Sequence, residues 1–187
     1  LEKQKETDHY QIQSLPINSG VFCLKKDRFQ DVVWIGTDGQ GVYLYSNPLY
    51  SIKSMVLSNY TEKIERPVRA IYLDDERTFW VGTKGNGILK IYDYEFDKNI
   101  SDCRAEVLTT SNSALSSNAV YCFAKSHRNL LWIGDEEGLT YYSYREKRIK
   151  SIPIRIGNED FKYIHDIYET ADSELWLASV GMGVVKA

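Results

Sequence analysis

The side chains best suited to binding a ligand in this 187-residue sequence stand at one position that recurs near the start of four similar segments. That position holds Phe22, Arg69, Tyr121 and His165. Core positions of a repeat tend to stay alike, so a position that changes between aromatic, cationic and imidazole side chains is expected to be exposed or to line a channel. Arginine, tyrosine and histidine can hydrogen-bond to, and stack on, a sugar or an anionic group. The predicted ligand-binding residues are Arg69, Tyr121, Tyr163, His165, Lys84 and Asn86.

Ordinary solvated loop chemistry is the alternative interpretation of each candidate, because connecting segments carry polar side chains whether or not they bind anything. Catalysis has less support from the sequence. His9, His127 and His165 stand far apart without an obvious serine or cysteine partner, so the sequence does not support a nucleophilic triad. We therefore predict no catalytic residue in this chain.

The spacing of acidic and cysteine residues does not predict a metal or redox site. Asp74-Asp75 and the run 135–137 match neither an EF-hand nor another calcium-loop spacing, so we interpret both as polar hairpins. Of the three cysteines, Cys23 and Cys122 occupy the same place in two repeats. A small buried thiol is the expected role there, rather than a disulfide or a nucleophile. We expect no metal and no cofactor.

The elements that position these side chains repeat along the chain. Each copy contains a tryptophan followed by an apolar residue, a small residue and a turn, and the tryptophans are spaced by 44 to 52 residues. Such a period is typical of a β-unit stacked on copies of itself. We interpret the tryptophan as core between units, and the glycine that follows it as a place where backbones approach closely. The four tryptophans are Trp34, Trp80, Trp132 and Trp176.

Aligning the copies on tryptophan predicts four short strands in each, rich in β-branched and aromatic residues, and no helix. Four antiparallel strands with apolar middle strands predict an all-β fold of about four β-propeller blades. The predicted first strands are 21–24, 68–73, 120–124 and 164–168, and the second strands open on the tryptophans. The third strands are 41–45, 87–92 and 139–142, and the fourth are 51–57, 105–109 and 148–154.

The ends of the sequence indicate how the blades are arranged. The segment 14–17 nearly repeats 151–154, the end of a predicted fourth strand. Either this N-terminal strand joins the three C-terminal strands and closes a four-bladed ring, or the chain is a piece of a larger propeller. We favour the second arrangement, because an unpaired third strand would invite association between sheet edges. The predicted units are a tail at 1–9, the last strand of a blade at 10–17, blades at 18–57, 58–109 and 110–156, and an incomplete blade at 157–187.

Composition excludes some classes of partner. A net charge of −3, a pI near 5.7 and the lack of a basic stripe give no electrostatic footprint for nucleic acid. No apolar run approaches the roughly 20 residues that a membrane helix needs. The first five residues lack the apolar region of a signal peptide. Contact with a membrane is therefore expected only through a longer parent chain.

The second copy resembles the two-component regulator propeller repeat most closely. The matching residues are Val68, Ile71, Asp74, Trp80-Val81-Gly82-Thr83, Gly85, Gly87, Leu89 and Tyr92, and 115–120 resembles the family's link between blades. The third copy lacks the second glycine, and the fourth reads Leu177-Ala178-Ser179 where the family has Ile-Gly-Thr. The resemblance covers about residues 10 to 187.

This resemblance implies a periplasmic role. In that family the propellers are the extracytoplasmic sensor of bacterial hybrid two-component systems, joined to a membrane helix and a cytoplasmic histidine kinase, and their usual inputs are oligosaccharides. This chain has no kinase, membrane helix or sandwich domain, so it would be one part of a sensing module. The resemblance thus implies a non-catalytic segment with an oligosaccharide ligand. The unpaired edge of the last predicted strand separately makes self-association through blade edges possible.

Two other classes remain open from the residues. A propeller lyase would need a histidine and a carboxylate that converge on the axial face. His165 and Asp166 are the local candidates, but neighbours on one strand point to opposite faces. A protein–protein interaction propeller is equally compatible with the tyrosine-rich loops.

Overall fold

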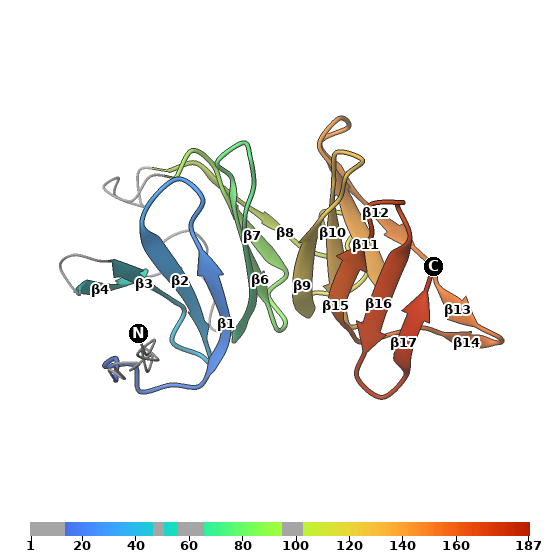
Figure 1. Ribbon diagram of the computed structural model, residues 1–187, viewed down its shortest axis with the longest axis horizontal. Coiled ribbons are helices and arrows are strands. Elements are labelled where there is room, and N and C mark those ends of the chain that lie inside the picture. The colour runs from blue at the N-terminus through green and yellow to red at the C-terminus, as the bar shows by residue number, and fades with distance from the viewer. Residues whose placement is uncertain (1–13, 47–50, 56–65, 95–102) are drawn as a thin grey trace, which may run out of the picture.

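The computed structural model describes residues 14–46, 51–55, 66–94 and 103–187, with the backbone alone for 51–55 (Figure 1). Within these ranges the protein is all-β and forms five antiparallel sheets, none of them closed into a barrel. The described part of the chain contains no helix of the length and apolarity needed to cross a membrane.

Four of the sheets follow one another along the chain, and each is a meander in which successive strands pair. Sheet 1 comprises β1 (Val21–Lys26), β2 (Val32–Thr37), β3 (Val42–Ser46) and β4 (Ser51–Met55). Sheet 2 comprises β5 (Val68–Leu73), β6 (Phe79–Thr83), β7 (Ile88–Ile91) and β8 (Ala105–Leu108). Sheet 3 comprises β9 (Val120–Lys125), β10 (Leu130–Asp135), β11 (Leu139–Ser143) and β12 (Arg148–Ile152). Sheet 4 comprises β15 (Ile164–Glu169), β16 (Leu175–Ser179) and β17 (Gly183–Lys186). A hairpin of β13 (Arg155–Ile156) and β14 (Glu159–Asp160) lies between sheets 3 and 4.

The predicted strands are confirmed to within a few residues at their ends. One prediction differs from the structure. Residues 14–17, expected to belong to a fourth strand, contain no strand, and 10–13 lie outside the described residues. Sheet 4 has three strands, so no N-terminal strand completes it within the described chain. Pro16 has no N–H to donate to a ladder, and its counterpart Pro153 also lies just beyond a strand rather than inside it.

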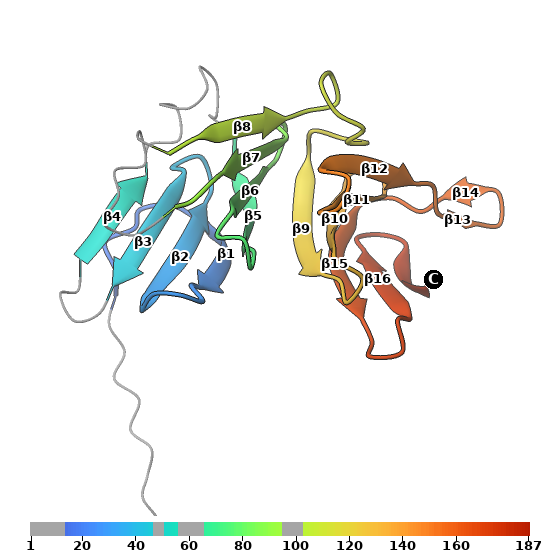
Figure 2. The same cartoon turned by 90° about the horizontal axis from the view of Figure 1, so that it is seen from above.

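The first strands of the four sheets lie side by side in one row. Contacts join β1 to β5, β5 to β9 and β9 to β15. Figure 2 shows the sheets spreading from this row, with β4, β8 and β12 on the outside. Consecutive sheets therefore face each other, and an apolar cluster fills each of the three spaces between them.

The repeated tryptophan fills these spaces, as predicted. Trp34 and Trp80 are fully buried and Trp132 is 7% exposed. Each contacts the next sheet: the ring of Trp34 lies 4.1 Å from that of Phe79, and the ring of Trp80 lies 4.8 Å from that of Tyr142. Trp176 of sheet 4 contacts no further sheet among the described residues and is 42% exposed. The tryptophan is thus the main inter-sheet core residue.

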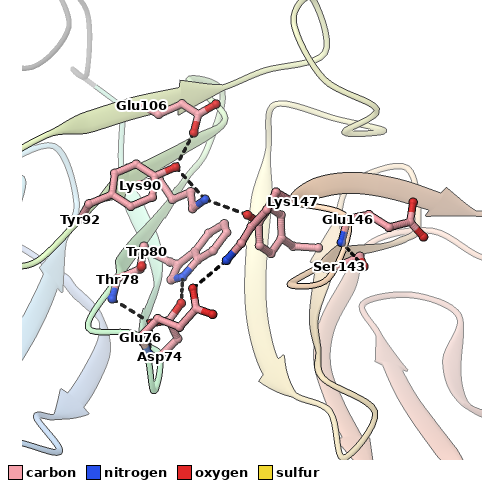
Figure 3. A network of polar contacts seen from close by, with 11 residues as sticks. Asp74, Glu76, Thr78, Trp80, Lys90, Tyr92, Glu106, Ser143, Glu146 and Lys147 are labelled. Atoms are coloured by element: carbon pink, nitrogen blue, oxygen red, sulfur yellow. Dashed lines mark hydrogen bonds and ion pairs between the residues drawn. The ribbon is translucent and has the colours of Figure 1, made fainter.

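The space between sheets 2 and 3 also contains a buried lysine (Figure 3). The Nζ of Lys90 donates to the hydroxyl of Tyr92 at 2.8 Å and to that of Tyr142 at 3.1 Å, and lies 4.7 Å from the ring of Trp80. Tyr92 in turn donates to Glu106 at 2.6 Å. Burial, chiefly, lowers the pKa of Lys90. This network ties the third strand of one sheet to the third strand of the next.

We expect the protein to lose stability as the pH rises above about 10, the ordinary pKa of tyrosine. Burial raises the pKa of Tyr142 to about 12, and burial also raises the pKa values of Tyr92 and Tyr144. Between the unfolded and the folded pKa values, these hydroxyls keep their protons in the folded protein but lose them in the unfolded chain. Their contribution to the free energy of unfolding is therefore complete below pH 10 and is lost as the pH rises through the folded pKa values. Denaturant midpoints measured across this range should fall, and the fall should be smaller in Tyr142→Phe. A midpoint that stays constant to pH 12 would contradict this account.

Candidate functional site

A β-bulge in each first strand positions the side chains at the recurring variable position. In all four sheets the pairing between the first and second strands shifts by one residue near the start of the first strand. An extra residue is then left without a cross-strand partner, and its side chain is re-aimed. The four unpaired residues are Phe22, Arg69, Tyr121 and His165. Because the first strands lie side by side, these side chains form one row, which we call the bulge row.

The bulge row consists of two stacked pairs. The guanidinium carbon of Arg69 lies 3.8 Å from the centre of the Phe22 ring. The rings of Tyr121 and His165 lie 4.1 Å apart at an interplanar angle of 18°. Phe22 and His165 are exposed, and Arg69 and Tyr121 are partly buried. Flat surfaces of this kind suit the apolar face of a sugar ring, with donors beside them.

The charges in the bulge row influence one another. The pKa of His165 is lowered, first by burial of the ring and then by the positive charge of Arg69. The pKa of Tyr121 is raised, mainly by burial and also by Glu136, while Arg69 acts in the opposite direction. His165 is therefore neutral near pH 7, and Arg69 is the cation of the row.

Arg69 has hydrogen-bonding capacity that the protein does not use. Its Nε is buried and has no hydrogen-bond partner among the described residues. A buried donor without a partner costs stability, so its presence in a native fold requires an explanation such as a functional role or a bound water or ion. Arg69 is thus the side chain of the row best prepared for a carboxylate, sulfate or hydroxyl acceptor.

Tyr163 lies at the same end of the first strands. It has a φ of 55° and is 43% exposed. Its N–H donates to the carbonyl of Glu136 at 3.0 Å, and its charge contributes to the raised pKa of Tyr121. The structure therefore brings four of the predicted residues together: Arg69, Tyr121, Tyr163 and His165.

Lys84 and Asn86 lie in the β6–β7 turn, and among the described residues no side-chain hydrogen bond or ring contact joins them to the bulge row. The Oδ1 of Asn86 accepts from the N–H of Arg66 at 3.2 Å, and its own N–H donates to the Oγ1 of Thr83 at 2.9 Å. The side chain of Lys84 is exposed, and its backbone bridges to Ala119. Asn86 thus holds its own turn, and Lys84 extends into solvent from that turn.

The turns after the second strands surround the start of the first strands. In every sheet the residue after the second strand donates its N–H to the carbonyl of the residue before the first strand. This bond joins the turn after the second strand to the start of the first strand, next to the bulge. The four bonds run from Asp38 to Gly20 (2.9 Å), Lys84 to Pro67 (2.9 Å), Glu136 to Ala119 (3.0 Å) and Val180 to Tyr163 (3.2 Å).

The acidic hairpins and the cysteines have structural roles. Asp74 accepts from Nε1 of Trp80 at 2.9 Å and from two backbone N–H groups. Asp135 accepts from Thr140 at 2.8 Å and from the N–H of Gly138, and burial raises its pKa. Burial also raises the pKa of Cys23 to about 11 and that of Cys122 to about 12, so both thiols stay protonated at neutral pH.

Two features of the site were not predicted from the sequence. Phe22 stands at the variable position, but its role as the platform under Arg69 depends on the stacking seen in the structure. The pairing of Tyr121 with His165 joins two sheets whose residues are 44 positions apart. Alignment of the four copies gives the position, and only the packed sheets give the partners.

Comparison with known proteins gives one relative in sequence and several in structure. No protein-family model matches the chain. Translation initiation factor 6 of Saccharolobus solfataricus is 31% identical over an alignment of 140 positions, and the match covers 68% of this chain and 57% of that protein. The chain therefore spans less than two thirds of the length of this relative.

Three solved structures are similar to the fold. PorZ, described as a surface component of the type-IX secretion system of Porphyromonas gingivalis, has a TM-score of 0.65, 14% identity and coverage of 89% of this chain and 25% of PorZ. The extracellular domain of the putative hybrid two component system BT3049 of B. thetaiotaomicron has a TM-score of 0.57 and 20% identity, and the match covers 97% of this chain and 29% of that domain. The extracellular domain of the putative one component system BT4673 of B. thetaiotaomicron has a TM-score of 0.57 and 14% identity, and the match covers 96% of this chain and 35% of that domain. At identities of 14–20%, the similarity concerns the fold alone.

Proposed function

We propose that this chain is a non-catalytic, ligand-sensing segment of the extracytoplasmic part of a hybrid two-component sensor. Its four sheets are the blades of part of a larger β-propeller, and it resides in the periplasm. The similar folds of the extracellular domains of a putative hybrid two component system and a putative one component system of B. thetaiotaomicron support this proposal. So does the repeat pattern around Trp34, Trp80 and Trp132.

The ligand proposed for the bulge row is an oligosaccharide. The observation that carries this proposal is the pair of stacks, Arg69 on Phe22 and Tyr121 on His165, at the exposed start of the first strands. Sugar rings present apolar faces to aromatic rings and hydroxyl or carboxylate oxygens to donors. The guanidinium of Arg69 offers planar, paired donors that suit a carboxylate.

The environment of His165 supports binding rather than proton transfer. An efficient histidine base is usually oriented by a carboxylate. The neighbouring Asp166 instead accepts the N–H of Ile167 with its Oδ1 at 2.9 Å. The contact partner of the imidazole is the ring of Tyr121. Turnover of an acidic polysaccharide that disappears in His165→Ala would contradict the proposal.

Replacing Arg69 by leucine is expected to weaken binding of an acidic disaccharide at least tenfold, because a charge-assisted hydrogen bond contributes about 1.5–3 kcal/mol. The probe is a disaccharide containing glucuronic acid, with cellobiose as the neutral comparison, and the affinity is measured by calorimetry. Arg145→Leu is the matched control, since Arg145 is exposed in the β11–β12 turn, away from the bulge row. Equal affinities of Arg69→Leu and the unmodified chain would exclude the bulge row as the site.

A further inference from the structure

The lysine between sheets 2 and 3 is buried without an ion pair. Lys90 is 4% exposed, and its Nζ has two hydroxyls as hydrogen-bond partners, those of Tyr92 and Tyr142. No carboxylate of the described chain lies within ion-pair distance of this amine. Lysine side chains are rarely buried unless a charged partner accompanies them. The position of Lys90 therefore requires an explanation beyond the packing of the core.

The repeat itself shows that the fold does not need an amine at this position. Lys90 lies opposite Trp80 in sheet 2, and Leu44 lies opposite Trp34 in sheet 1 in the same register. Leu44 is 4% exposed, so an apolar side chain fills the equivalent place in a buried core. The amine of Lys90 is thus an addition to the repeat rather than one of its packing requirements.

A cavity that is partly open to solvent lies between the two sheets and includes Lys90 in its lining (Figure 3). Its volume is about 480 Å³, and Tyr142 and Glu106 also line it. Pockets for small molecules usually measure about 300–1,000 Å³. The Nζ of Lys147 pairs with Glu76 at 2.9 Å beside this cavity, and both side chains are more than half exposed. Exposed ion pairs contribute little to stability, so this pair does not close the cavity.

The amine is more often neutral than that of an exposed lysine. Burial chiefly lowers the pKa of Lys90, Glu106 opposes this effect and Lys147 adds to it, while Asp74 and Glu76 also raise the pKa. A lowered pKa increases the share of amine that carries a free lone pair near pH 7. Lysines desolvated in this way react with carbonyl compounds to form Schiff bases. The chemistry that suits this cavity is therefore attack of the amine on a carbonyl carbon.

The two hydroxyls beside the amine suit the proton transfers of that reaction. Burial raises the pKa of Tyr142 to about 12, so its hydroxyl keeps its proton at neutral pH. No acceptor among the described residues takes this proton, which leaves it for a carbonyl oxygen. The hydroxyl of Tyr92 accepts from Lys90 at 2.8 Å and donates to Glu106 at 2.6 Å. One hydroxyl can thus donate to the ligand, and the other leads from the amine to a carboxylate.

We propose that Lys90 is the binding site for a small hydroxyaldehyde, such as a triose or the open-chain form of a reducing sugar, which it holds as a reversible imine. The Nζ forms a bond to the carbonyl carbon while the π electrons move to the oxygen, to which Tyr142 donates. Both protons of the neutral amine leave the nitrogen, one of them through Tyr92, and the oxygen departs with two protons as water. One amine and one aldehyde give one imine and one water, without an oxidant or a reductant.

The test is reductive labelling of the intact chain with D-glyceraldehyde and cyanoborohydride at neutral pH, followed by peptide mapping after digestion at glutamate. Exposed Lys84 is the internal reference. Labelling at Lys90 is expected to be at least about tenfold faster than at Lys84, because a positioned acid and a lowered pKa act together. The rate at Lys90 should also level off as the aldehyde concentration rises, whereas the rate at Lys84 should stay proportional to it. Lys90 labelled no faster than Lys84 would overturn the proposal.

Three variants assign the reaction to this cavity. Tyr142→Phe keeps the ring but removes the hydroxyl, and should slow labelling at Lys90 at least about tenfold without changing Lys84. Lys90→Leu, which carries the residue of sheet 1, should stay folded in circular dichroism melts and lose the fast site. Arg69→Leu, in the bulge row, is the control and should be labelled normally at Lys90. A folded Tyr142→Phe variant that is labelled at the unmodified rate, or a fast site that persists in Lys90→Leu, would contradict the proposal.

Discussion

Replacing Trp80 by alanine is expected to lower the free energy of unfolding by about 3–5 kcal/mol, the range observed for a deleted core tryptophan. Trp80 is fully buried between sheets 2 and 3, and its Nε1 donates to Asp74 at 2.9 Å. The substitution opens a cavity between two sheets and leaves a buried carboxylate with one donor fewer. A loss of this size is a large part of the roughly 5–15 kcal/mol that holds a domain folded.

Trp176→Ala is the matched control for this prediction, since it removes the same side chain from the same repeat position. Trp176 is 42% exposed, so its loss should cost only about 1–2 kcal/mol in the monomer. Both variants are compared by urea denaturation at a protein concentration low enough to keep the chain monomeric. Equal losses in the two variants would show that the tryptophan acts within its own sheet and not between sheets.

Gly134→Ala is expected to destabilise the fold by about 3 kcal/mol, at the upper end of the usual cost of overpacking. A Cβ at this position would lie 2.5 Å from the Sγ of Cys122 and 2.5 Å from the carbonyl oxygen of Ile164. Ile164 begins the first strand of the next sheet, so the clash is with backbone and sheets 3 and 4 would have to separate. Such a shift would also disturb the stack of Tyr121 on His165.

Gly20→Ala is the control for the glycine prediction. The nearest atom to a Cβ there is the Cβ of Asp38 at 3.6 Å, an ordinary contact. We expect a change within about 0.5 kcal/mol, as at most surface positions. Thermal or urea unfolding of the two variants gives the comparison. A Gly134→Ala variant as stable as Gly20→Ala would mean that the first strands are not as closely packed as described.

The strands could be predicted from the sequence because their signals are local. The tryptophan, the small residue after it and the glycine turn recur in register, and each strand is rich in β-branched and aromatic residues and bounded by turn residues. The close approach of backbone to the glycine after the tryptophan was predicted for the same reason and is confirmed at Gly36 and Gly134, whereas at Gly82 the close neighbours are side chains. Local similarity also misled at 14–17, where the likeness to 151–154 includes Pro153 and Ile154, which lie outside β12.

The parts that could not be predicted depend on pairing between strands and between sheets. A bulge is a difference in residue count between two paired strands, so the sequence of one strand does not reveal it. Trp132 illustrates the second case. Sheets 1 and 2 supply Asp27 and Asp74 to their own tryptophans, but Ser126 stands at that position in sheet 3, and Trp132 donates to Glu169 of sheet 4 at 2.8 Å. The packing of sheet 3 on sheet 4 therefore determines the partner of Trp132, and the sequence of sheet 3 alone does not reveal it.

The most direct test of binding at the bulge row is the protonation of His165, followed by NMR while the glucuronic acid disaccharide is added. In the free protein, burial and the charge of Arg69 hold the pKa of His165 below its ordinary value of about 6.5. A carboxylate bound at Arg69 offsets that charge, so the pKa should rise, and by linkage the affinity should increase as the pH falls from about 7 to about 5. The NMR signals of His127, exposed in the β9–β10 turn, should not shift when the disaccharide is added. A bound disaccharide that leaves the pKa of His165 unchanged would contradict the site proposed here.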